Sequence, residues 1–272
     1  MKPIIKKLGT IDLDVVETTP VVFRGTLYRF EYVRQNYWAN RTGKSYFRFV
    51  NHDTGVFSKP FAQGYHLGNV MVEDDTIYVT ATDIWNGERV DIFKSVDMEN
   101  WESWNALDLP GYGIFNTSLC RAGDRYILMF EVGEPVAVAG VPFTARFATS
   151  FDMKKWELTS SDCTYSKDRY TAPHCIRFHD GTFYNFYLEA VPGGYEQYVV
   201  RSKDLIQWES SPYNPVLAAS EDDRQIINPA ITPEQRQRIK TAININNSDI
   251  DFCEYDNRLV INYSWGNQEG IE

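Results

Sequence analysis

The chain has 272 residues, 43% of them hydrophobic, enough to bury about three quarters of its unfolded surface, which excludes an intrinsically disordered chain. Its net charge of −10 and its lack of Lys and Arg clusters exclude nucleic acid as an expected partner. No stretch approaches the ~20 apolar residues of a membrane span, and the first residues lack the apolar centre of a signal peptide, so we expect no membrane partner and a cytoplasmic location.

Strand patterns dominate the chain, as apolar stretches bounded by Gly, Asp or Asn turns. Five of them repeat one phrase: a polar start, an apolar strand, a short turn, then a second strand with a Tyr near its beginning. In chain order the copies span residues 18–33, 67–83, 115–132, 172–190 and 248–265. Successive copies are roughly fifty residues apart, except that the last interval is longer.

A second phrase, Ser-x-Asp-(Met/Leu)-x-x-Trp, follows the second, third and fourth hairpins. It begins at Ser95, Ser150 and Ser202. We expect each Ser and Asp to hydrogen-bond its own turn and each Trp to pack between neighbouring sheets. Only residues 232–245 indicate a clear helix, with Thr232 as N-cap and Gln235 completing a capping box.

These repeats predict an all-β fold, a five-bladed β-propeller with one short helical insertion before the last blade. We expect a single domain over residues 1–272, with the insertion at about 209–247. Residues 49–55 are a degenerate copy of the turn in the first blade, and a strand within residues 4–13 is expected to complete the last one. A β-sandwich also has strands every ~8 to 12 residues, but it does not explain self-similarity at about fifty.

Equivalent positions of a propeller form rings around its axis, so three sets of aligned residues are expected to face one central pit. The starts of the inner strands align Glu17, Leu67, Phe115, Pro173 and Asp249. Two residues later come Thr19, Asn69, Thr117, Cys175 and Asp251. The ends of the second strands align Val33, Asp83, Glu131, Glu189 and Trp265.

Carboxylates gathered around a pit suit the cleavage of a glycosidic bond, which needs one protonated and one ionised carboxyl group. The candidate catalytic residues are Asp249, Glu189, Glu131, Glu17 and Asp83. The candidate substrate-binding residues are His66, Asn69, Asn116, Arg169, His174, Asp251, Trp265 and Arg34, with Trp38 as a further stacking residue. Any one of these side chains is alternatively a turn cap or a solvated rim charge.

The repeated Trp turns and the "DG-x-(F/Y)-Y" hairpin resemble those of the five-bladed propeller glycosidases. That group contains arabinanases, β-xylosidases and α-L-arabinofuranosidases, with more distant neo-agarooligosaccharide hydrolases and mannoside phosphorylases. The resemblance covers most of the chain from about Glu17 onward. It implies an oligosaccharide substrate and a glycoside hydrolase, which we expect to be exo-acting and inverting on plant or algal cell-wall fragments.

The usual catalytic residues of that group are replaced. Where arabinanase-type enzymes have an Asp-Pro pair with Asp as general base, this chain has Thr19-Pro20. Where they have Glu-Gly-Pro-His with Glu as general acid, it has Thr171-Ala172-Pro173-His174. A threonine hydroxyl transfers no proton near neutral pH, so membership with the usual residues is excluded.

Two alternatives remain for the chemistry. In the first, the catalytic residues lie one or two positions around the pit from the usual ones, with Asp249 as base, Glu189 or Glu131 as acid, and Asp83 or Glu17 adjusting their pKa values. Alternatively His174 is the acid, as a histidine is thought to be in the neo-agarooligosaccharide hydrolases.

Other readings of function stay open. A phosphorylase would need a phosphate site, for which Arg169, His174 and Arg34 are candidates, and a non-catalytic carbohydrate-binding propeller would need no proton transfer. We expect no cofactor: the cysteines show no C-x-x-C spacing, and the oxygen-rich stretch 244–251 lacks the ligand pattern of an EF-hand, leaving a structural Ca²⁺ as the lesser alternative. A monomer or weak homo-oligomer is expected.

Overall fold

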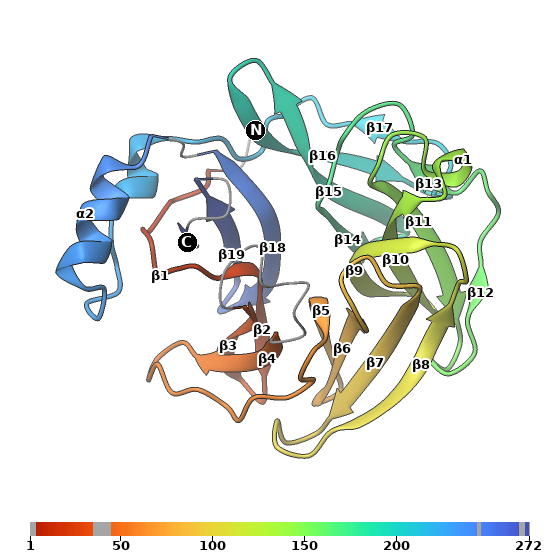
Figure 1. Cartoon of the computed structure of the whole chain (residues 1–272), viewed down its shortest axis with the longest axis horizontal. Coiled ribbons are helices and arrows are strands. Elements are labelled where there is room, and N and C mark those ends of the chain that lie inside the picture. Colours follow the sequence, from red (N-terminus) through yellow and green to blue (C-terminus); the bar gives the residue numbers. More distant parts are fainter. Residues whose placement is uncertain (1–3, 35–44, 244–245, 267–269, 272) are drawn as a thin grey trace.

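The structure is a computed structural model that describes residues 4–34, 45–243, 246–266 and 270–271. These residues form five antiparallel sheets arranged around a common centre (Figure 1). Each sheet turns one strand toward the centre, and neighbouring inner strands contact one another around the ring. The chain is therefore an all-β propeller, as its repeats predict.

The first two sheets follow each other directly along the chain. The first contains β2 (Val16–Phe23), β3 (Thr26–Val33) and β4 (Tyr46–Asn51). The second contains β5 (His66–Glu73), β6 (Thr76–Thr82), β7 (Arg89–Ser95) and β8 (Glu102–Asp108). The first sheet has three strands within the described residues, so five full four-stranded blades are not confirmed.

The third and fourth sheets repeat the same order from the centre outward. The third contains β9 (Gly113–Ala122), β10 (Arg125–Glu134), β11 (Thr144–Ser150) and β12 (Glu157–Leu158), and β13 (Thr164–Tyr165) also pairs with β11. The fourth contains β14 (His174–His179), β15 (Thr182–Val191), β16 (Gly194–Ser202) and β17 (Glu209–Ser210).

The last sheet joins the two ends of the described chain. It contains β18 (Asn247–Tyr255), β19 (Arg258–Trp265), β20 (Gly270–Ile271) and the N-terminal strand β1 (Asp12–Leu13), which pairs with β20. The expectation that a strand within residues 4–13 completes this sheet is confirmed. The pairing of β1 with β20 thus ties the N-terminal segment to the last sheet.

The Trp turns are built as expected. In the turn at Ser95, the Ser95 hydroxyl oxygen accepts from the backbone N–H of Met98 at 2.9 Å, and Asp97 Oδ1 accepts from that of Asn100 at 2.8 Å. Trp101 stacks on Phe61, with ring centroids 3.8 Å apart, within an apolar cluster shared by the first two sheets. This turn thus fastens the second sheet to the first.

Helical segments are short. The expected helix is α2 (Pro233–Thr241), with the Thr232–Gln235 capping box in place. The chain also forms α1 (Val136–Ala139) and the 3₁₀ helix η2 (Glu221–Arg224), which the sequence pattern did not indicate. In the described part of the chain no helix is long and apolar enough to cross a membrane.

A buried ion pair holds the N-terminal segment against the last sheet. Lys7 Nζ lies 2.7 Å from Asp223 Oδ1, and the side chain of Asp223 is fully buried. The same carboxylate accepts from the Tyr263 hydroxyl at 2.7 Å. The pair therefore links the segment before β1 to η2 and to β19.

We expect Lys7→Ala to lower the free energy of unfolding by about 3 kcal/mol, because it leaves the Asp223 carboxylate buried without its counter-ion. Urea denaturation measures this loss. Lys6→Ala is the control, since Lys6 is exposed. Equal stabilities of the two variants would contradict the role of the pair.

Candidate functional site

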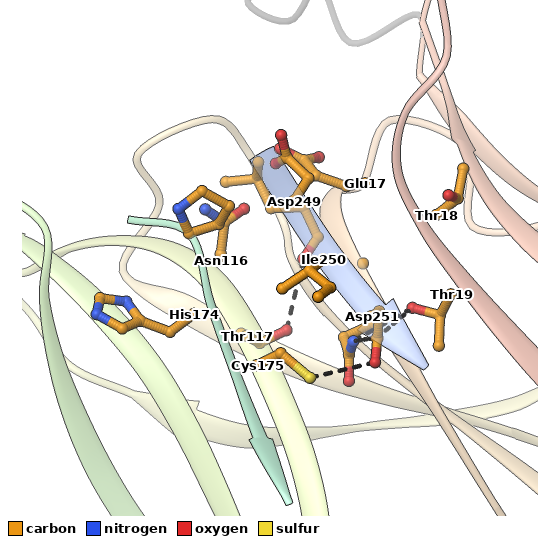
Figure 2. A pocket seen from close by; sticks show the side chains of 14 residues that line it. Glu17, Thr18, Thr19, Asn116, Thr117, His174, Cys175, Asp249, Ile250 and Asp251 are labelled. Atoms are coloured by element: carbon orange, nitrogen blue, oxygen red, sulfur yellow. Dashed lines mark hydrogen bonds between the residues drawn. The ribbon is translucent and has the colours of Figure 1, made fainter. Parts of the chain in front are cut away.

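A pocket opens at the centre of the propeller (Figure 2). It is lined by 14 residues, which come from the starts of the five inner strands. All five members of the second expected ring line it: Thr19, Asn69, Thr117, Cys175 and Asp251. So do four members of the first ring, Glu17, Leu67, Pro173 and Asp249.

Irregular backbone aims three of these side chains. Glu17, Leu67 and Asp249 have left-handed φ angles of 57°, 54° and 54°. Each lies where the pairing of its strand with the next shifts register, which marks a β-bulge. A non-glycine residue in this conformation costs roughly 1–3 kcal/mol, and such strain gathers at functional sites. Three sheets carry it at the same level of the pocket.

Asp251 forms the floor of the pocket. Its Oδ2 accepts from the Thr19 hydroxyl at 2.7 Å and from Asn69 Nδ2 at 2.9 Å. Its Oδ1 accepts from Cys175 Sγ at 3.2 Å and forms an ion pair with Arg177. One carboxylate thus joins β18 to β2, β5 and β14, and it has little capacity left for a ligand.

Glu17 and Asp249 form the acidic part of the pocket. Figure 2 shows their side chains together, away from the Asp251 floor. Asp249 Oδ2 accepts from the Ser248 hydroxyl at 2.5 Å. Glu17 Oε2 is buried and has no hydrogen-bond partner among the described residues.

The ionisation of Glu17 is strongly perturbed. Burial raises the pKa of its carboxyl group to about 8; the negative charges of Asp249 and Glu131 act in the same direction, and Arg34 opposes them. Glu17 is therefore mostly protonated at neutral pH. A protonated carboxyl group in a pocket beside a second carboxyl group is an arrangement suited to proton transfer.

Glu131 lies behind the wall of the pocket and positions two residues that line it. Its Oε1 accepts from the backbone N–H and from Nδ1 of His174, both at 2.8 Å, and its Oε2 accepts from Asn116 Nδ2 at 2.9 Å. His174 Nε2 lies 3.0 Å from the Thr171 hydroxyl. Both imidazole nitrogens therefore have partners, which fixes the ring as part of the wall.

The third expected ring does not face the pocket; none of its described members line it. Asp83 accepts from the backbone N–H of Ile84 at 3.0 Å, and burial raises its pKa. Glu189 binds the guanidinium of Arg169, with Oε2 at 3.0 Å from Nη2. Trp265 is fully buried and donates to the Thr10 hydroxyl at 3.0 Å. Each of these three side chains is held by a partner outside the pocket lining.

The remaining expected binding residues also lie outside the pocket lining. His66 is buried between the Tyr32 hydroxyl, 2.6 Å from its Nδ1, and Ser45. Burial lowers the pKa of His66 to about 4, so it is neutral. Arg34 is buried beside the Tyr32 ring, where its charge acts on Glu17. Trp38 and Asn244 lie outside the described residues.

Some residues of the site were not singled out from the sequence. Thr18, Gly68 and Ile250 line the pocket because each directly follows a residue at a bulge. Arg177 supports the floor from β14. In the described chain no group of three or more His, Cys, Asp and Glu side chains is placed to hold a metal ion.

Comparisons with known proteins agree on the fold. No protein-family model matches the chain, and no curated protein matches it by sequence. An α-L-arabinofuranosidase from Podospora anserina, solved with cellotriose, superimposes with a TM-score of 0.61 at 8% identity, over 94% of this chain and 88% of that one. An endo-1,4-β-xylanase from Bacteroides thetaiotaomicron gives 0.60 at 12% identity, over 93% and 84%. A putative glycoside hydrolase from Bacteroides ovatus gives 0.61 at 12%, over 96% and 87%.

These neighbours are glycoside hydrolases, and the likeness at such low identities shows a shared propeller fold.

The raised pKa of Glu17 makes stability depend on pH. Its ordinary value is 4.5 and its value in the folded protein about 8, so the folded state retains a proton that the unfolded state loses. This contribution is fully present below pH 4.5 and is lost as the pH rises through 8.

We therefore expect the free energy of unfolding to fall between pH 5 and pH 8 in the wild type, and to fall less in Glu17→Gln, which has no proton to lose. Urea denaturation at each pH measures both slopes. Glu134→Gln, at an exposed position, should follow the wild type. Parallel curves for wild type and Glu17→Gln would contradict the raised pKa.

Proposed function

We propose that the protein hydrolyses glycosidic bonds at the ends of plant or algal cell-wall oligosaccharides. The observation that carries this proposal is the Glu17 carboxyl group, whose pKa is raised by burial, beside Asp249 in a pocket at the axis of the propeller. Fold neighbours described as arabinofuranosidase and xylanase support the choice of substrate class.

The two carboxyl groups take complementary roles. Glu17 donates its proton to the oxygen between two sugar units as the bond from that oxygen to the anomeric carbon breaks. Asp249 accepts a proton from the water molecule that adds to the same carbon. Inversion follows because water attacks directly, without a covalent intermediate.

Glu17 replaces Glu189 and Glu131 as the proposed acid. The Glu189 oxygens accept several N–H bonds from Arg169, and Glu131 has three donors of its own behind the wall. Both carboxylates are occupied, whereas Glu17 Oε2 is buried without a partner in the described chain. Glu17 is thus proposed as the proton donor rather than as a residue that adjusts others.

The closed floor of the pocket supports cleavage at the ends of an oligosaccharide rather than within it. The Asp251 network closes the axis with bonds to three other inner strands, so an oligosaccharide does not pass through the propeller.

We count the three-stranded first sheet as a blade, which makes five in all.

Leaving-group dependence tests the assignment of the acid. We expect Glu17→Gln to lower kcat/KM on natural oligosaccharides by about 10²- to 10⁴-fold, the usual contribution of a general acid. On dinitrophenyl glycosides, whose leaving group departs without protonation, the loss should be under tenfold. Asp249→Asn should lower kcat/KM on both kinds of substrate.

The substrate is first found by incubating the wild type with a broad oligosaccharide panel and detecting released monosaccharide by mass spectrometry, with and without phosphate. Glu134→Gln is the control for the variants. Equal losses of Glu17→Gln on both kinds of substrate would contradict its role as acid. Release of sugar phosphate only when phosphate is present would replace hydrolysis by phosphorolysis, and affinity without any product would indicate a binding protein.

A further inference from the structure

A row of five aromatic rings runs across the second, third and fourth sheets. Each ring contacts the next: Trp85–Phe115 at 5.8 Å, Phe115–Phe143 at 4.3 Å, Phe143–Tyr170 at 5.9 Å and Tyr170–Tyr195 at 6.5 Å between centroids. We call these five residues the aromatic row. It plays no part in the chemistry proposed above.

The row lies on the face where the pocket opens. Trp85 is in the connection from β6 to β7, Phe143 follows α1, and Tyr170 precedes β14. The end of β6 pairs with the start of β5, and the end of β10 with the start of β9, so these connections lie beside the starts of inner strands. The row is also continuous with the pocket in the chain, because Phe115 directly precedes the lining residue Asn116.

The rings of the row are only partly covered, unlike those of the core. Phe30, Phe47 and Phe49 in the first sheet are 0% exposed, whereas Tyr170 is 39% exposed. The other four rings of the row are half-buried. A continuous aromatic surface left open to water beside a pocket marks a binding surface more often than a folding requirement.

A glycine at position 133 leaves space for two rings of the row. A Cβ atom on Gly133 would lie 2.7 Å from Phe115 Cε2 and 3.4 Å from Phe143 Cε1. Gly133 therefore allows these two rings to lie over β10 in edge-to-face contact, at an interplanar angle of 77°. Rings held in this way lose little further conformational entropy when a ligand covers them.

The position of the row next to the pocket indicates which ligand it binds. A sugar ring presents C–H groups on its faces and hydroxyl groups at its edge, so it can cover an aromatic ring while its hydroxyls stay in water. We propose that the aromatic row binds the sugar units that follow the one in the pocket, and so makes the site selective for longer oligosaccharides. The substrate class rests on the proposed function; the row itself does not require turnover.

Tyr170→Ala tests the row, in a Glu17→Gln background so that no ligand is consumed. The probes are xylo-, arabino- and cello-oligosaccharide ladders of two to six units, and native mass spectrometry measures the affinities. We expect affinity for at least one ladder to rise with length, and Tyr170→Ala to lower affinity for its longest members about fivefold while leaving the shortest unchanged. Tyr213→Ala, which removes a tyrosine that is 42% exposed after the outer strand β17, should change neither.

Affinity that does not rise with length in any ladder, or that Tyr170→Ala lowers equally for all lengths, would overturn the row as a binding surface. Thermal unfolding shows that each variant is folded. Length-dependent binding by a wild type that releases no sugar would leave the row in place and overturn the proposed hydrolysis. Turnover by a wild type whose affinity does not rise with oligosaccharide length would overturn the row as a binding surface and leave the proposed hydrolysis in place.

Discussion

Hydrogen bonds and an ion pair of the Asp251 carboxylate hold the inner strands together at the axis of the propeller. A closed propeller brings its inner strands together at the axis, where polar side chains must satisfy one another away from water. Asp251 on β18 does this for β2 and β5 through Thr19 and Asn69, and for β14 through Cys175 and Arg177. Asn69 Oδ1 in turn accepts from a backbone N–H of β9, at Leu119. All five inner strands are thus joined at one level, and the pocket has a fixed floor.

Above that floor, strained backbone and buried carboxyl groups occur at the same positions. The bulges at Glu17 and Asp249 hold two acidic side chains in one hollow, from adjacent strands β2 and β18. Burial there makes an ionised Glu17 costly, so it keeps its proton. A rigid frame is what allows a carboxyl group to remain in surroundings that do not suit its charge.

The sequence predicted the parts of the molecule that repeat and missed those that do not. Inner strands recur in one register, so aligning hairpins was enough to place Thr19, Asn69 and Asp251 in one ring. The ends of the second strands failed as a ring because their side chains follow local partners: Glu189 turns to Arg169, and Trp265 packs toward Thr10. Spacing along the chain carries no information about such partners. The aromatic row was missed for the same reason, since its rings come from connections that differ between the repeats.

The proposed chemistry requires Glu17 to be protonated at neutral pH. Carbon-13 NMR of protein labelled at the glutamate carboxyl carbons tests it most directly, with the Glu17 signal assigned by its loss in Glu17→Gln. We expect a titration midpoint near pH 8 that moves to lower pH in Asp249→Asn, where one of the neighbouring negative charges is removed. A midpoint near the ordinary value of 4.5, unchanged by Asp249→Asn, would contradict it.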